Sequence, residues 1–108
     1  MYYYKAVAKL LGKLLSIYDG KTEYLLGKTM HEEVIEGHKG GFYVYPNLEE
    51  AIFADVPNKK GGLYIAPRTI LKCMCWGNRY EYDKGKLAFS YLIPVQDIGM
   101  PKGYIGKH

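Results

Sequence analysis

The stretch TILKCMCW, residues 69–76, constrains the fold of this chain more than any other. Successive side chains of a strand point to opposite faces of its sheet. In this stretch both faces are largely apolar, one with Leu71, Cys73 and Cys75 and the other with Ile70, Lys72, Met74 and Trp76. A strand that is apolar on both faces is covered on both, so the sequence predicts a central strand here.

Shorter patterns of alternation predict further strands around this one. Residues 2–9 place charge on one face only, and a turn with Gly12 leads to a hairpin partner at residues 13–18. Residues 28–40 do not alternate and are expected to form a loop, with room for one helical turn in HEEVIE. We expect the other strands at residues 22–26, 41–46, 79–83 and 86–95, with a strand stub at 63–67.

One helix is expected directly after the strand at residues 41–46. Asn47 is a favourable N-cap residue, and Glu50 follows three positions later, as in a capping box. The helix is therefore predicted to begin at Leu48, with a buried stripe that includes Ala51 and Ile52. Val56 extends that stripe and Pro57 is expected to end the helix.

These elements predict the fold class α+β. We expect a single domain with a mostly antiparallel, curved sheet or partly open barrel of about six strands, and one short helix near residues 48–55. A chain of 108 residues has the length of one domain. Residues 1–95 are expected to form that domain, and residues 96–108, rich in glycine and proline, a C-terminal tail.

The chain carries no signal for a membrane. No apolar run approaches the roughly 18 residues that a membrane-spanning helix needs, and lysines interrupt the apolar N-terminal stretch, unlike in a signal peptide. A disulfide between Cys73 and Cys75, one residue apart, would be strained, so reduced core thiols are expected. We therefore expect a cytoplasmic protein, located in the host cytoplasm if it is encoded by a phage.

Charge is unevenly distributed along the chain. The net charge is +4, yet residues 31–55 hold six acidic side chains and one lysine, whereas residues 56–108 hold nine basic and three acidic side chains. An anionic ligand near the basic flanks would explain this pattern. A mixed, solvated surface explains it as well.

Few residues favour catalysis or metal binding. His31 and His38 bracket Glu32, Glu33 and Glu36, which suggests a metal site, but the spacing does not match a helical histidine pair and a solvated loop is the alternative. There is no catalytic triad, glycine-rich phosphate loop or pair of catalytic carboxylates. No metal and no cofactor are expected.

Aromatic side chains interleaved with basic ones are the remaining signal. The chain has twelve tyrosines, and a base can stack on an aromatic ring while lysine or arginine attracts phosphate. Packing within the sheet explains many tyrosines equally well. Tyr43 and Tyr45 are expected to point outward from their strand. The candidate ligand-binding residues are Tyr4, Lys5, His38, Tyr43, Tyr45, Trp76 and Arg79.

The order of these segments resembles that of small uncharacterised domains in phages and bacteria. The resemblance rests on YYYKAV, LLSIYDGKTEYLLGK, GGFYVYPNLEEAIFA, ILKCMCWG and KLAFSYLIPV. The chain is more distantly similar to the ADP-ribosyltransferase-like fold, in which a first strand and a Gly-aromatic strand precede a short helix. That family has an arginine or histidine on its first strand and a catalytic glutamate late in the chain. In this sequence Lys5 stands at the first of these places and Glu81 is the late glutamate.

Three functions follow as hypotheses. The first is a small non-enzymatic, phage-type binding protein, expected as a homo-oligomer, that sequesters a nucleotide-like ligand or signal in host-defence evasion. The second is an interaction module that inhibits a host protein through residues 32–36 and the helix at Leu48. The third is a degenerate ADP-ribosyltransferase-like enzyme that depends on Glu81.

Overall fold

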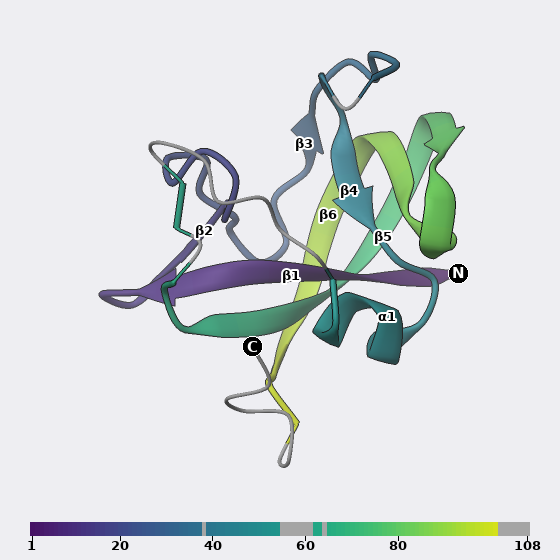
Figure 1. Ribbon diagram of the computed structural model, residues 1–108. Helices are drawn as coiled ribbons and strands as arrows, with labels where there is room; N and C mark the ends of the chain where they lie inside the picture. Colours follow the sequence, from purple (N-terminus) through teal and green to yellow (C-terminus); the bar gives the residue numbers. More distant parts are fainter. Residues whose placement is uncertain (38, 55–61, 64, 102–108) are drawn as a thin grey trace.

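Two long antiparallel strands dominate the fold of the computed structural model, which describes residues 1–37, 39–54, 62–63 and 65–101. They are β5 (Arg68–Glu81) and β6 (Leu87–Gly99), joined by the 3-10 turn η1 (Asp83–Gly85). The other elements in Figure 1 are β1 (Tyr2–Leu10), β2 (Lys13–Leu15), β3 (Met30–His31), β4 (Phe42–Val44) and α1 (Leu48–Ile52).

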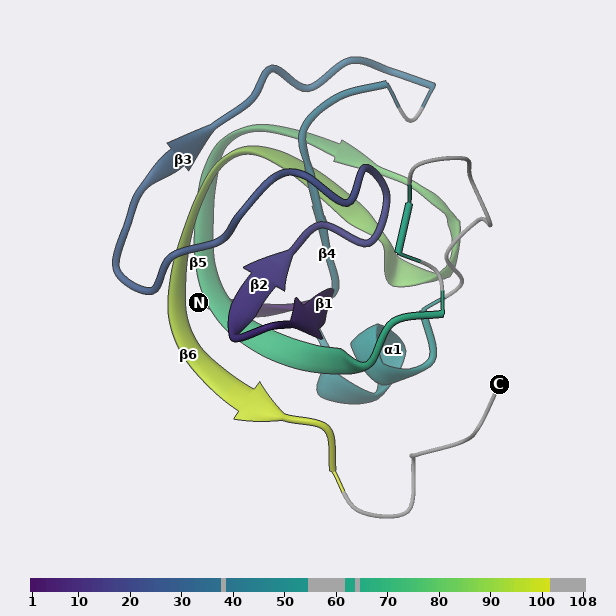
Figure 2. The same cartoon turned by 90° about the vertical axis from the view of Figure 1, so that its left-hand side faces the viewer.

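All strand pairs are antiparallel and form one sheet. The strand order is β2-β1-β5-β6-β3, and β4 pairs with the first part of β6. Figure 2 shows β5 and β6 following the same curve around the interior. Backbone hydrogen bonds in both directions between Tyr4 and Tyr45 (N···O 2.8 Å) join the end of β4 to β1. The sheet is therefore a curled half-barrel within a single domain, as the sequence predicted in outline.

Apolar side chains are buried on both sides of the sheet. The inner cluster fills the half-barrel and includes Val7, Leu71, Cys73 and Leu92. The outer cluster lies between α1 and the sheet and comprises Tyr45, Ala51, Ile52 and Ile70, with partly buried residues around it. Because β5 lies between β1 and β6 and contributes to both clusters, the prediction of a central strand is confirmed.

Several predicted strand limits are wrong. The predicted strands at 69–76 and 79–83 are one strand, β5, because its pairing with β6 continues past a bulge between Trp76 and Arg79. The predicted strand at 22–26 is reduced to one bridge between Glu23 and Leu15, and the described residues of 63–67 form no strand. Conversely, β3 lies in a segment expected to be a loop without strands, since β6 offers it an edge.

The end of β6 also differs from the prediction. Its pairing with β5 continues to Gly99, so residues 96–99, expected as part of an irregular tail, are in the sheet. The Asp97 carboxylate fixes this end by accepting hydrogen bonds from Thr69 Oγ1 (2.5 Å), Lys9 Nζ (3.0 Å) and the backbone N–H of Gly99 (3.0 Å). Contacts with β1 and β5 thus supply the order that the local sequence lacks.

The predicted helix begins at Leu48, as expected, but α1 has only five residues. Ala51 and Ile52 are buried, as predicted. The capping box is not formed, because Asn47 Nδ2 donates to Glu50 Oε1 (2.7 Å) and the Asn47 side chain makes no bond to a backbone N–H. Val56 and Pro57 lie outside the described residues. In the part of the chain that the structure describes, no helix is long and apolar enough to cross a membrane.

Candidate functional site

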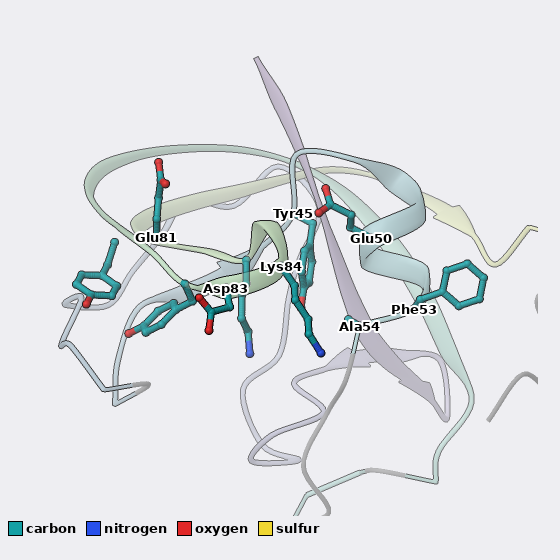
Figure 3. A pocket seen from close by; sticks show the side chains of 10 residues that line it. Tyr45, Glu50, Phe53, Ala54, Glu81, Asp83 and Lys84 are labelled. Carbon is teal, nitrogen blue, oxygen red and sulfur yellow. The ribbon is translucent and has the colours of Figure 1, made fainter.

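A cleft of about 690 Å³ separates α1 from the end of the β5–β6 hairpin. Its walls combine aromatic rings with charged groups of both signs. In Figure 3, Glu50 and Phe53 reach it from the side of α1, whereas Glu81, Asp83 and Lys84 reach it from the hairpin. The complete lining is Tyr45, Glu50, Phe53, Ala54, Tyr80, Glu81, Tyr82, Asp83, Lys84 and Lys86.

The turn at the hairpin end shapes one wall of the cleft. Lys84 (φ 61°) and Gly85 (φ 77°) both have left-handed backbone conformations, which reverse the chain within η1. A Cβ on Gly85 would collide with the Glu50 carboxylate, so the glycine lets α1 approach the hairpin closely. The strands predicted at 79–83 and 86–95 thus leave Lys84 and Gly85 between them, and the structure places a tight turn at these two residues.

A row of four tyrosine rings runs from the cleft into the half-barrel. Ring centroids are 4.6 Å apart for Tyr80 and Tyr82, 6.0 Å for Tyr82 and Tyr43, and 5.6 Å for Tyr43 and Tyr18. We call these four residues the tyrosine row. Lys86, which lines the cleft, holds its Nζ 5.0 Å from the centroid of the Tyr43 ring and 5.7 Å from that of Tyr18. These distances allow cation–π attraction, so a cation lies beside the row.

Lys5 lies at the inner end of this arrangement. Its side chain projects from β1 into the half-barrel and is only 4% exposed. Nζ donates a hydrogen bond to the backbone carbonyl of Tyr43 (2.8 Å) and lies 5.7 Å from the Tyr24 ring centroid. Desolvation lowers the pKa of Lys5 to about 8, an effect that the nearby Cys73 partly opposes. A lysine whose charge is this sensitive to its surroundings is a candidate functional group.

Two of the cleft carboxylates, those of Glu50 and Glu81, have partners among neighbouring side chains. Glu81 forms an ion pair with Arg79 (3.1 Å), and Glu50 accepts the hydrogen bond from Asn47. In Figure 3 the carboxylates of Glu50 and Glu81 point in the opposite direction from the ammonium of Lys84. The Asp83 carboxylate, by contrast, points to the same side as the Lys84 ammonium in Figure 3, so hydrogen-bond acceptors and a cation occur together on that side of the cleft.

The structure brings together four of the predicted site residues. Tyr45 lines the cleft, Tyr4 is paired with it through the backbone, and Lys5 contacts Tyr43. The expectation that Tyr43 and Tyr45 both point outward is wrong for Tyr45, whose side chain is 8% exposed because α1 covers it. Tyr43 is half-buried, and desolvation raises its pKa to about 12.

The remaining predicted residues lie elsewhere. Trp76 is on the outer face of the sheet, where its ring stacks on Tyr91 at 5.5 Å and an interplanar angle of 2°, with His31 against the same tyrosine. Arg79 is connected to the cleft only through its ion pair with Glu81. His38 lies outside the described residues.

Several residues of the site were not predicted from the sequence. Tyr18 and Tyr24 approach Tyr43 and Lys5 only because the segment after β2 folds back over the half-barrel. Lys84 lies between two predicted strands and Lys86 begins the second of them, and neither lysine was predicted to be a cleft residue. Of these residues, Tyr80 and Tyr82 could have been found from the sequence, because two alternating tyrosines beside Arg79 match the pattern of aromatic and basic side chains expected for ligand binding.

Metal-binding and thiol chemistry find no support among the described residues. Nowhere in these ranges do three His, Cys, Asp or Glu side chains gather as a metal site. Burial raises the pKa of both Cys73 and Cys75 to about 12, so these thiols stay protonated at neutral pH. The cleft and the tyrosine row can bind a ligand through aromatic rings, hydrogen-bond acceptors and lysines.

Comparison with known proteins finds no match to a protein-family model, a curated protein or a solved structure. Function is therefore inferred from the side chains of the cleft and the tyrosine row.

Proposed function

We propose that the protein is a non-enzymatic binding protein whose cleft holds a nucleotide-like ligand. The observation that carries this proposal is that Lys84 and Lys86 line the same cleft as Tyr80 and Tyr82, with Lys86 Nζ 5.0 Å from the ring centroid of Tyr43, because rings and cations are needed together by a ligand with an aromatic base and phosphates. Binding without turnover would sequester the ligand, which fits the proposed role in host-defence evasion.

Each part of such a ligand has a matching group in the cleft. Tyr80 and Tyr82 offer ring faces for a base. The carboxylates of Glu50 and Asp83 can accept hydrogen bonds from sugar hydroxyls. Lys84 and Lys86 supply the charge that phosphates require. A volume of about 690 Å³ falls in the range of small-molecule sites.

Calorimetric titration with mono-, di- and triphosphates of adenosine and guanosine tests the proposal. We expect Tyr82→Ala to weaken binding by about tenfold or more, since stacking on one base is worth about 1–3 kcal/mol. Tyr2→Ala is the matched control, because Tyr2 is an exposed ring on the outer face of the sheet. Lys86→Gln should weaken triphosphate more than monophosphate binding, with exposed Lys28→Gln as its control.

The proposal fails if none of these nucleotides binds and native mass spectrometry of the purified protein shows no small molecule. Recovery of the ligand in unchanged form supports sequestration. Consumption of NAD that Glu81→Gln abolishes would instead support the ADP-ribosyltransferase-like alternative.

A second proposal concerns partner proteins. Two large apolar side chains that are two residues apart on β5, Met74 and Trp76, are 45% and 42% exposed on the outer face of the sheet. Exposed apolar residues that lie together favour protein contact over solvent. We propose that this face joins copies of the chain in a homo-oligomer, and that a host protein is the competing partner. The helix at Leu48 is less suited to that role, because Ala51 and Ile52 are buried.

A further inference from the structure

We propose that Lys5 and Lys86 together bind the anionic group of the ligand at the inner end of the tyrosine row, next to Tyr43. This inference rests on the proposed function, because it assigns the position of the phosphate end of the same ligand. It adds a buried residue of β1 that does not line the cleft.

The first observation is the incomplete pairing of the Lys5 ammonium. An ammonium group has three N–H donors, and in the described structure one of them is bonded, to the Tyr43 carbonyl. Neither ion pair found among these residues involves Lys5. A buried charge that forms no ion pair is costly, and an anion that binds next to it would reduce this cost.

The second observation is the position of a second cation on the same tyrosine ring. Lys5 Nζ lies 6.0 Å and Lys86 Nζ 5.0 Å from the centroid of Tyr43. Repulsion from Lys86 is one of the effects that lower the pKa of Lys5. An anion bound between the two ammonium groups would remove this repulsion.

Other groups around Lys5 do not replace such an anion. Among the residues that the structure describes, Glu32 is the carboxylate with an electrostatic effect on Lys5, and desolvation raises the pKa of Glu32 although Lys5 opposes this rise. The thiols are protonated at neutral pH. The titratable groups that face Lys5 from the elements packed around it are Tyr24, Glu32, Tyr43, Cys73, Cys75 and Lys86.

Access to Lys5 runs past the ring of Tyr43. Lys86 is part of the cleft lining, and Tyr43 lies between the cleft residue Tyr82 and the buried Lys5. Because Lys5 is only 4% exposed, the proposal requires the half-buried Tyr43 side chain to move when the anion binds. The anion then exchanges contact with water for contact with two ammonium groups.

Titration with inorganic phosphate at constant ionic strength tests the inference. At pH 7.5 we expect Lys5→Met to bind phosphate at least tenfold more weakly than the wild type, whereas Lys28→Met, an exposed control, binds it unchanged. Equal binding by Lys5→Met and the wild type would overturn the inference, as would a wild type that does not bind phosphate.

A measurement on the wild type covers the case in which Lys5→Met does not fold. Phosphate affinity should fall by up to tenfold per unit between pH 8 and pH 10, because Lys5 loses its proton in that range. A constant affinity would contradict the inference. Tyr82→Ala separates the two proposals: it should lose nucleotide binding and keep phosphate binding. If nucleotides bind but Lys5→Met binds phosphate as tightly as the wild type does, only this inference fails.

Discussion

Individual residues set the conditions under which this fold is stable, and Lys5 is the clearest case. Its burial among tyrosines, thiols and apolar side chains lowers its pKa from 10.5 to about 8. A shift of this size corresponds to roughly 3 kcal/mol of unfolding free energy lost at neutral pH, where the folded state must hold the buried charge. A buried charge that lowers stability is better explained by function than by packing.

Substitution of Lys5 tests this cost directly. The unfolded chain keeps the Lys5 proton up to pH 10.5, while the folded chain releases it near pH 8, so the wild type gains stability from this group as pH rises between these values. We therefore expect Lys5→Met to be more stable than the wild type at pH 7 by up to about 3 kcal/mol, and the difference to shrink by pH 10. Urea unfolding of both proteins at both pH values measures it.

Buried tyrosines and cysteines such as Tyr24 and Cys73 also have raised pKa values. They are present in both the wild type and Lys5→Met, so their effect on the unfolding free energy drops out of the difference between the two proteins. A Lys5→Met protein that is less stable at pH 7 would show that the ammonium supports the fold.

Gly77 is a residue whose role depends on a neighbouring strand. It has φ 90°, and a Cβ at this position would collide with Ser90 Oγ and approach Tyr91 Cδ2 to 2.7 Å. We expect Gly77→Ala to reduce the unfolding free energy by about 2 kcal/mol or more, from strain and overpacking combined.

Gly12 provides the control for this substitution. It has φ 77°, and nothing lies within 4 Å of a Cβ built on it, so Gly12→Ala should cost only the backbone strain of about 1 kcal/mol. Equal losses in thermal unfolding would show that contact with Ser90 and Tyr91 does not matter.

Pairs of strands decide where regular structure ends. The bulge at Gly77 and Asn78 does not interrupt β5, because Asn78 donates its N–H to Ser90 Oγ (2.9 Å) on β6 and pairing resumes at Arg79. At the opposite end, Asp97 holds β6 against β1 and β5. The bonds of Asn78 to Ser90 and of Asp97 to Lys9 and Thr69 could not be predicted from the sequence, since each joins residues that are distant along the chain.

Replacement of Asp97 tests the end of β6. Desolvation raises the pKa of Asp97, but hydrogen bonds from Thr69, Lys9 and Gly99 outweigh it and the net pKa is lowered. The charged form therefore stabilises the fold, and this contribution is lost as pH falls below the usual range of an aspartate. We expect Asp97→Asn to cost about 1–2 kcal/mol at pH 7 and less at pH 3.

Exposed Glu23→Gln serves as the control, with a change close to zero. Hydrogen exchange of residues 96–99 gives a second measure, and unchanged protection in Asp97→Asn would contradict the assignment.

The whole molecule has two faces with different properties. The inner face is closed by the Tyr4–Tyr45 bridge and leads to the cleft, whereas α1 covers only part of the outer face. The uncovered part holds Met74 and Trp76, each more than 40% exposed. A ligand and a partner protein can therefore be bound at separate places.

Self-association is expected to be a property of the whole molecule, because it depends on the exposed outer face of the sheet. We expect the wild type to dimerise or assemble further with rising concentration, and Met74→Lys to weaken this by at least tenfold, because a charge would be buried in the contact. Leu11→Lys is the control, since Leu11 is 94% exposed in the turn after β1. Sedimentation velocity over a range of concentrations measures the effect. A wild type that stays monomeric throughout would refute the oligomer.

The sequence alone determined the kind of fold and the nature of its central strand. Alternation in residues 69–76 identifies β5, and the change to helical spacing after Pro46 places the start of α1, because both patterns follow from local geometry. The sequence also identified Tyr43, Tyr45 and Lys5 as candidate binding residues, because aromatic side chains are interleaved with basic ones along the chain.

Only the tertiary structure decided which of these side chains meet. The pairing of β5 with β6 extends both strands beyond their local signals, and the curl of the sheet brings Tyr18, Tyr43 and Tyr82 into one row. The same curl buries Lys5 and leaves Trp76 on the opposite face. Contacts between residues distant in sequence arise from closure of the half-barrel, which a period-two pattern cannot encode.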